Sequence, residues 1–153
     1  VQIITNGGGY GVITTDSVIA AGNLAMARMN EKIKNKLKRE IKNDLVSFGN
    51  PLDLIGDADT ERYRKSLDAC IKDNNIDAII LIVLYQTPLI TTDIVDVISE
   101  YHKIGKKPIL VVSTGGSFTR VLRDALVDEG VCTFEFPEHA VKSLSRLVEY
   151  CGR

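Results

Sequence analysis

The segment from Ala78 to Tyr85 constrains the fold of this chain more than any other segment does. It reads Ala-Ile-Ile-Leu-Ile-Val-Leu-Tyr, with apolar side chains at odd and even positions alike. Such a run is far shorter than the ~18 apolar residues of a membrane span, and it is typical of a strand that is covered on both faces in a parallel sheet. Because parallel strands are joined by long crossovers, usually helices, we expect helices on both faces of a central sheet.

The rest of the chain alternates between strand and helix patterns. Strands are expected at about 1–5, 24–26, 78–85, 108–113 and 131–134, and helices at about 10–21, 30–43, 59–72, 92–104, 117–130 and 137–150. Residues 48–56 are expected to form a loop. Asn30, either Asp59 or Thr60, and Ser117 are predicted to cap helices. With right-handed connections, this order predicts a single flavodoxin-like α/β domain over residues 1–153, a three-layer, doubly wound sheet of about five mainly parallel strands.

Composition narrows the class of protein. The 153 residues are 44% hydrophobic and carry a formal net charge of -1, which gives no electrostatic case for binding nucleic acid or an anionic membrane. The lysine-rich helix at 30–43 has no interleaved aromatic residues, so we interpret it as a solvated face. Three widely spaced cysteines favour free thiols and a cytoplasmic location over disulfides or zinc. No signal peptide is recognised, and the start on Val1, directly before a strand, suggests a domain excised from a longer chain.

A glycine-rich loop at Asn6–Gly11 follows the first strand and leads into a helix. Glycine is expected there because the backbone needs φ values that other residues avoid, or because nothing may stand between the amides and a ligand. A helix start with free amides binds phosphate or carboxylate. The loop lacks the Gly-Lys-Ser/Thr of a P-loop, and Val12 stands where the dinucleotide pattern needs glycine. Two interpretations therefore remain open, a simple strand-to-helix turn and an anion site.

Three polar loops follow the expected strands and should face one another at the carboxyl edge of the sheet. They are Asn6–Gly11, Gln86–Thr92 and Ser113–Ser117. The residues proposed to bind phosphate are Asn6, Gly7, Gly8, Gly9, Tyr10 and Gly11. The other residues proposed to face the site are Gln86, Thr87, Thr91, Thr92, Ser113, Thr114, Gly115 and Gly116.

Catalytic side chains are scarce in this sequence. His102 and His139 fall at helix positions that normally face solvent, and no G-x-S-x-G elbow is present. The aspartates that could serve as acids, bases or metal ligands are interpreted as turn and cap residues; they are Asp16, Asp53, Asp57, Asp59 and Asp93. This chain lacks the acidic cluster that a phosphoacceptor receiver domain needs, and only Tyr10 and Tyr85 are placed to flank a flavin, so both alternatives are weakened. We therefore expect no catalytic residue and no metal ligand here.

Three motifs in order resemble a known family. They are Thr-Asn-Gly-Gly-Gly-Tyr-Gly-Val-Ile-Thr-Thr-Asp at Thr5–Asp16, Asn-Pro-Leu-Asp-Leu-Ile-Gly at Asn50–Gly56 and Thr-Pro-Leu-Ile-Thr-Thr-Asp at Thr87–Asp93. The segment Gly130–Ala140 adds a fourth match. Together they resemble the C-terminal flavodoxin-like domain of the alpha part of ADP-forming acyl-CoA synthetases, such as acetate–CoA ligases, in the succinyl-CoA synthetase superfamily.

The resemblance implies a domain that acts within a larger ligase. Members of the family interconvert acyl-CoA, ADP and phosphate with acid, CoA and ATP through a phosphohistidine, and Mg²⁺ accompanies the nucleotide. The glycine loop would help to receive the phosphoryl group, and the domain would form part of the subunit interface. Its partners would be a CoA-binding Rossmann domain, a second flavodoxin-like domain with the catalytic histidine, and an ATP-grasp subunit.

The resemblance also implies that this domain is inactive alone. The family's Ser-His-Thr-Gly motif is absent, and neither His102 nor His139 matches it. Tyr10 stands where relatives carry a small residue or proline. An alternative is a non-catalytic regulatory or assembly domain of a synthetase-like protein acetyltransferase. The sequence does not identify the acyl substrate.

Overall fold

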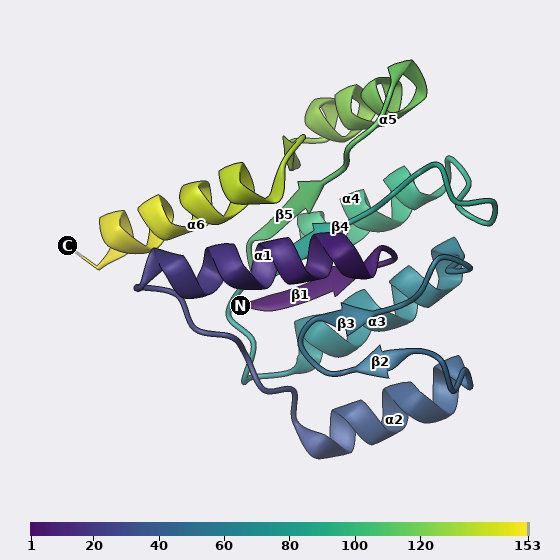
Figure 1. Cartoon of the computed structure of the whole chain (residues 1–153), viewed down its shortest axis with the longest axis horizontal. Coiled ribbons are helices and arrows are strands. Elements are labelled where there is room, and N and C mark those ends of the chain that lie inside the picture. Colours follow the sequence, from purple (N-terminus) through teal and green to yellow (C-terminus); the bar gives the residue numbers. More distant parts are fainter. Residues whose placement is uncertain (153) are drawn as a thin grey trace.

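The computed structural model describes residues 1–152 and shows an α/β domain built on one six-stranded sheet (Figure 1). The strands are β1 (Gln2–Thr5), β2 (Ser47–Phe48), β3 (Leu52–Asp53), β4 (Ile79–Ile82), β5 (Ile109–Val112) and β6 (Cys132–Phe134). The helices are α1 (Gly8–Ala21), α2 (Glu31–Ile41), α3 (Thr60–Lys72), α4 (Ile94–Ile104), α5 (Ser117–Asp128) and α6 (Pro137–Cys151).

The strand order is β2-β3-β1-β4-β5-β6. The five strands from β3 to β6 pair in parallel, and without β2 their order is the flavodoxin-like one that the sequence predicts. β2 is an additional antiparallel edge strand beside β3. Neighbouring β1 and β4 send their helices to opposite faces of the sheet, so the point where strand order reverses lies between them.

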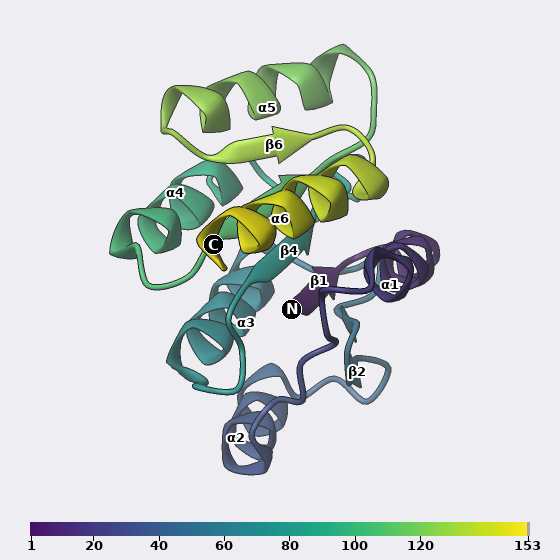
Figure 2. The ribbon, with the colours of Figure 1, turned by 90° about the vertical axis from the view of Figure 1, so that its left-hand side faces the viewer.

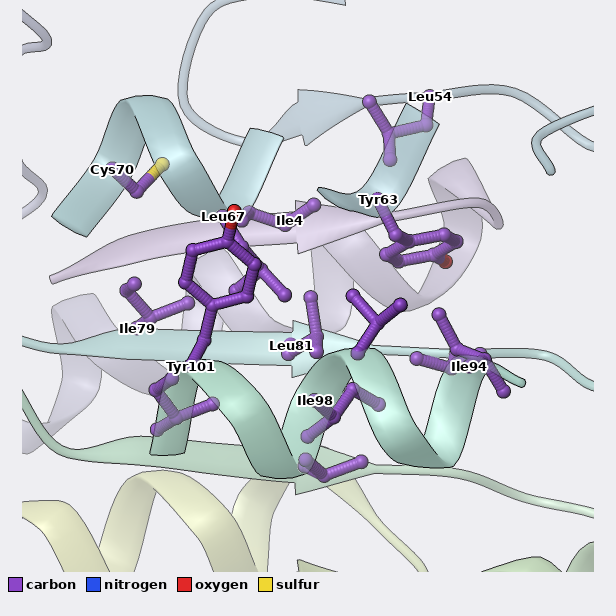
Figure 3. Close-up of a cluster of buried hydrophobic side chains, with 14 of the residues drawn as sticks. Ile4, Leu54, Tyr63, Leu67, Cys70, Ile79, Leu81, Ile94, Ile98 and Tyr101 are labelled. Carbon is purple, nitrogen blue, oxygen red and sulfur yellow. The ribbon is translucent and has the colours of Figure 1, made fainter. Parts of the chain in front are cut away.

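Two apolar clusters, one on each face of the sheet, hold the layers together. Along β1, Ile3 packs with Val18 of α1 and Leu144 of α6, whereas Ile4 belongs to the cluster under α3, α4 and α5. Figure 2 shows the helices on either side of the sheet, and Figure 3 shows the second cluster with Ile4 beside Leu67. The predicted β4 strand is confirmed, because Ile79 to Ile82 are all fully buried.

Tyr63 and Cys70 bring polar groups into the larger cluster. The hydroxyl of Tyr63, a fully buried side chain, donates a hydrogen bond of 2.8 Å to the carbonyl oxygen of Ile82. Burial raises the pKa of the Cys70 thiol to about 12, so this cysteine stays protonated at neutral pH. The cysteines of the described residues are free thiols, as predicted. No helix within residues 1–152 is both long enough and apolar enough to span a bilayer.

Two of the predicted helix caps are confirmed, and one is wrong. Asn30 caps α2 by accepting from the amide of Lys32 at 2.9 Å, and Asp59 caps α3 by accepting from the amide of Arg62 at 2.8 Å. Ser117 is not a cap but the first residue of α5, and Gly116 precedes it without a side-chain bond. The glycine takes the cap position because the chain leaves β5 through a turn that brings Gly116 into extended backbone.

Two other expectations about local structure are wrong. Residues 24–26 form no strand, although the backbone of Ala27 bonds to Val1. The amide of Asn50 donates to the carbonyl oxygens of both Val1 and Ala27, and a side chain thus takes the place of a strand ladder. The expected loop at 48–56 contains the end of β2 and all of β3, since its Leu52 pairs with Ile4 of β1.

Candidate functional site

Asn6 fixes the start of the glycine loop against the end of β4. The side chain is 3% exposed, and its amide donates to the carbonyl oxygen of Leu84 at 3.2 Å and to the hydroxyl of Thr87 at 3.1 Å. Its Oδ1 accepts from the backbone amide of Leu84 at 2.9 Å. Three bonds from one side chain therefore join the first polar loop to the second.

The second polar loop is joined to the third in the same way. Gln86 donates through Nε2 to the carbonyl oxygen of Thr114 at 2.8 Å. A Cβ atom on Gly115 would lie 2.3 Å from both Gln86 Nε2 and Thr119 Oγ1, so these side chains pack closely against the glycine. The three loops thus follow adjacent strands β1, β4 and β5 and make contact in sequence, with Gln86–Thr92 in the middle.

Thr91 and Thr92 lie at the far end of the middle loop and serve α4. The hydroxyl of Thr91 donates to the carboxylate of Asp93, which also accepts from Thr60 at 3.0 Å. Both hydrogen bonds lower the pKa of Asp93, and the bond from Thr91 has the larger effect. The carbonyl oxygen of Thr92 accepts from the amide of Val95. Both threonines are exposed, and their hydrogen bonds tie them to the start of α4 rather than to the glycine loop.

Three of the loop glycines, Gly7, Gly8 and Gly11, serve close packing and not unusual φ values. α1 already begins at Gly8, and Gly7 has an ordinary extended φ of -139°. The positive-φ glycines of the described residues are Gly22, Gly105 and Gly130. The first reason expected from the sequence is therefore wrong. A Cβ on Gly7 would lie 2.5 Å from Leu84 Cδ1.

Glycine is needed for the same reason at two further loop positions. A Cβ on Gly8 would lie 2.8 Å from Asp53 Oδ2, and one on Gly11 would lie 3.2 Å from Pro51 Cγ. Because each of these glycines has no side chain of its own, a side chain from a neighbouring segment packs against the start of α1. The close approaches bring the β1 loop against residues in and just before β3 and just after β4.

Gly9 is different, because it faces open space. No heavy atom lies within 4 Å of a Cβ built on it, and Gly8 and Gly9 are both exposed. Within residues 1–152 the amides of these two glycines have no acceptor, the cap residue Gly7 makes no side-chain bond, and the first turn holds no acidic residue. The positive end of α1 therefore presents unpaired N–H groups at the carboxyl edge of the sheet, as an anion requires.

Tyr10 does not stand over these amides. It is half-buried and packs against the apolar cluster beneath α1 and α6, and its backbone amide donates to the carbonyl oxygen of Gly7 at 3.0 Å. The ring thus anchors the first turn of the helix to the core. This position leaves the exposed side of the turn to Gly8 and Gly9.

A second glycine-led helix start lies two strands away, at α5. Gly116 makes no side-chain cap bond and the first turn holds no acidic residue. Ser113 and Tyr85, at the ends of β5 and β4, are buried with hydroxyl oxygens that have no hydrogen-bond partner within the described residues. Burial raises the pKa of Tyr85, and nearby Ser113 and Arg123 oppose that rise. The carboxyl edge of the sheet therefore carries neutral hydroxyl groups and backbone amides between the starts of α1 and α5.

The histidines lie outside these three loops. His102 is half-buried in the last turn of α4, and His139 is exposed in the first turn of α6, edge-on to Phe136 with 6.0 Å between ring centroids. Within residues 1–152 no group of three or more His, Cys, Asp or Glu side chains is placed to hold a metal ion. A hollow of about 440 Å³, lined by Met26, Phe48 and Asn50 among others, lies beside β2 and the start of β1, away from the loops.

Asp53 is a site neighbour that the sequence did not identify. Its Oδ1 accepts from the amide of Ile55 at 2.9 Å, the turn role that was predicted, but its Oδ2 also packs against Gly8. The sequence did not reveal this contact because β3 is only two residues long. Nothing in the sequence therefore placed Asp53 beside Thr5 of β1.

Comparison with known proteins gives a consistent result. The family model described as the Ligase-CoA domain matches residues 1–137. The alpha subunit of ADP-forming acetate–CoA ligase I of Pyrococcus furiosus is 31% identical over 152 residues, which are 98% of this chain and 32% of that protein. The ADP-forming acetate–CoA ligase of Methanocaldococcus jannaschii is 32% identical over 154 residues, 98% of this chain and 22% of that protein.

Solved structures agree with these relatives. A crystal structure of a protein from Pyrococcus horikoshii OT3 superposes with a TM-score of 0.90 at 29% identity, over 97% of this chain and 35% of that one. Acetyl-coenzyme A synthetase 1 of Ca. Korarchaeum cryptofilum, in complex with phosphate and ADP, gives a TM-score of 0.87 at 27% identity, over 98% of this chain and 32% of that one. The chain spans about a third of the length of the Pyrococcus furiosus subunit and of the two solved structures, and 22% of the Methanocaldococcus jannaschii ligase.

Proposed function

Because the chain belongs to the Ligase-CoA domain family, we propose that it is the phosphate-receiving domain of an ADP-forming acyl-CoA synthetase. The observation that carries this proposal is the open start of α1, where the amides of Gly8 and Gly9 have no acceptor within residues 1–152. The relatives are named for ADP-forming CoA ligation, and one solved relative is a complex with phosphate and ADP.

In this proposal the chain acts by electrostatics and positioning. As a phosphoryl group arrives, negative charge on its oxygens meets preorganised N–H groups and the positive end of the α1 dipole. Asn6 holds the loop in place through its bonds to Leu84 and Thr87, so the amides need no rearrangement when the charge arrives. No side chain of the loop has to react.

The remaining parts of the reaction belong to other domains of the parent enzyme. We propose that the phosphoryl group is carried on a histidine of a second flavodoxin-like domain, and that CoA, ATP or ADP and Mg²⁺ bind to a Rossmann domain and an ATP-grasp subunit. The exposed Val12 and Ile13, on α1 just after the glycine loop, would lie in the interface with that second domain. This chain alone is then inactive.

The test is labelled-phosphate transfer from ATP to the reconstituted parent enzyme. Gly9→Asp places a carboxylate at the open position and should abolish labelling. Gly9→Ala is the matched control, because it adds a Cβ that meets no atom within 4 Å and carries no charge; it should be labelled like the native enzyme. Equal labelling of native and Gly9→Asp enzymes would show that the loop is only a structural turn and does not receive the phosphoryl group. A native parent that is never labelled would favour the regulatory alternative.

A further inference from the structure

A groove lies between α2 and β2, at the edge of the sheet where β2 ends the strand order. It consists of two hollows of about 440 Å³ and 260 Å³, and Phe48 of β2 lines both of them. From α2, Lys34 lines the first hollow, and Lys38 and Lys42 line the second (Figure 1). No residue of the glycine loop lines either hollow, so this groove is separate from the proposed phosphate site.

The lysines of the groove form a row along one side of α2. Lys34, Lys38 and Lys42 are four residues apart, so successive lysines lie about 6 Å from one another on the same side of the helix. Lys34 is paired with Glu31 at 2.5 Å, whereas Lys38 and Lys42 form no ion pair within residues 1–152. The row therefore presents two free ammonium groups to the groove.

Arg28 adds to the positive charge of the first hollow. Its side chain is half-buried and, among the residues that the structure describes, has no ion-pair partner. The acidic residues that line the hollows are Glu31, which is paired with Lys34, and Asp44. Within the described part of the chain, three unpaired cations thus share the groove with one unpaired carboxylate. Such a surface favours an anionic partner.

β2 forms the opposite wall of the groove and leaves one edge of its backbone unpaired. It is the outermost strand, and within residues 1–152 the backbone of Ser47 and Phe48 pairs with β3 and with no other segment. An unpaired edge is a template for a further strand. The ammonium group of Lys38 lies 5.8 Å from the centre of the Phe48 ring, so the row of lysines directly adjoins this strand.

We propose that the groove is a docking surface for an extended acidic segment of a partner polypeptide, which adds a strand to β2 and places its carboxylates on the lysines of α2. Alternate residues of a strand point to one face and lie about 6.6–6.8 Å apart, close to the spacing of about 6 Å along the lysine row. The residues between the acids find an apolar contact in Leu45, which precedes β2 and is 76% exposed.

The free strand edge favours a polypeptide over a nucleic acid. Main-chain N–H and C=O groups of β2 pair with another peptide backbone. A nucleic-acid strand would use the positive charges alone, and Phe48 is a single ring where such binders stack several bases. The interpretation of this helix as a solvated face then applies to Lys32 and Lys36, on the opposite side of α2, and not to the row.

The first experiment follows the fluorescence anisotropy of a labelled peptide of about eight residues, alternating Glu and Val, as this chain is added at ~0.1 M salt. Lys38→Glu should weaken binding about tenfold, as expected for two units of charge about 6 Å from a carboxylate. Lys32→Glu is the matched control, because it makes the same change on the opposite side of α2, and it should stay within about twofold of the native chain. Circular dichroism checks that both variants are folded.

The second experiment tests strand addition with two N-methylated forms of the same peptide, one methylated at the Glu amides and the other at the Val amides. Alternate amides of a strand point to opposite edges, so one form should lose at least about tenfold in affinity and the other should bind like the unmodified peptide. Equal binding of the two forms would overturn the pairing with β2. No binding of the unmodified peptide, equal losses in Lys38→Glu and Lys32→Glu, or tighter binding of a labelled oligothymidine would overturn the docking surface itself.

Discussion

Two helices that start at the same edge of the sheet differ in how their first amides are used. α3 is closed by its own sequence, because Asp59 accepts from the Arg62 amide, Glu61 adds negative charge to the first turn, and Arg62 is tied to Asp57 and to the Leu54 carbonyl oxygen. α1 begins with Gly7, Gly8 and Gly9 and has neither a side-chain cap nor an acidic first turn.

The difference shows how one piece of backbone geometry serves two purposes. Every α-helix starts with amides that lack intrahelical partners. Where a carboxylate two or three residues earlier accepts from them, the helix start is a structural element. Where glycines leave the amides free and a buried asparagine fixes the loop by hydrogen bonds, the helix start is available to an external anion. The following changes test that contrast, from the largest expected effect to the smallest.

Asn6→Ala should lower the free energy of unfolding by about 2–3 kcal/mol, the largest change in this series. It removes three hydrogen bonds and leaves the Leu84 amide without its acceptor beneath the loop. Urea unfolding followed by circular dichroism measures the loss. Asn75→Ala, which removes an exposed side-chain bond to the Arg28 carbonyl oxygen, should change stability by under about 0.5 kcal/mol. Equal effects from the two variants would show that the loop is not held by Asn6.

Asp59→Ala should cost about 1 kcal/mol, because it uncaps α3. The same unfolding measurement applies, and amide exchange should speed up at Arg62, whose N–H loses its acceptor. Asp44→Ala removes an exposed carboxylate outside any helix and serves as the control. An unchanged exchange rate at Arg62 would mean that the cap does not protect this helix start, and the contrast with α1 would disappear.

Gly9→Ala should stabilise the chain by about 0.5 kcal/mol, since a helical glycine costs conformational entropy and the added methyl group meets open space. Gly11→Ala should give no such gain, because its Cβ would lie 3.2 Å from both Pro51 Cγ and Thr5 Cγ2. The melting temperatures of the two variants distinguish a glycine that faces open space from a glycine that is packed against other side chains. A gain at Gly11 that matches the one at Gly9 would contradict the packing shown here.

Asp93 gives the smallest effect, and it depends on pH. Its pKa in the folded chain is lowered from 3.8 by hydrogen bonds from Thr91 and Thr60, so its stabilising contribution is present above that pH and is lost as the pH falls through the lowered value. The side chain is exposed, and the contribution should stay below about 0.5 kcal/mol. The stability difference between native and Asp93→Asn chains should therefore shrink from pH 6 to pH 3; a difference that grows toward acid would reverse the assigned sign.

The sequence predicted the sheet and the order of its elements well, because burial on both faces leaves a clear pattern. Ala78–Tyr85 could only be a central strand, and Asn30 stood before an amphipathic helix. The short elements were missed for the opposite reason. β2 and β3 have two residues each, too few for periodicity to appear, and just after residues 24–26 the side chain of Asn50 bonds to the carbonyl oxygen of Ala27.

The glycine loop illustrates the same limit within the candidate site. Its position after β1 and the likeness of its motif to Ligase-CoA domains were evident from residues 5–16, and the family is confirmed. The reason for its glycines was not evident. Their backbone is ordinary, and it is Leu84, Asp53 and Pro51, distant in sequence, that pack closely against Gly7, Gly8 and Gly11.

The amino-acid sequence by itself determined the α/β alternation, the buried parallel strands and the presence of a glycine-led helix start, because each depends on residues that are neighbours along the chain. Only the tertiary structure decided which glycine is open, that Asn6 bonds to the end of β4, and that the Asp53 carboxylate lies against Gly8. These contacts join residues 45 to 81 positions apart, and strand pairing in the sheet is what brings such residues together.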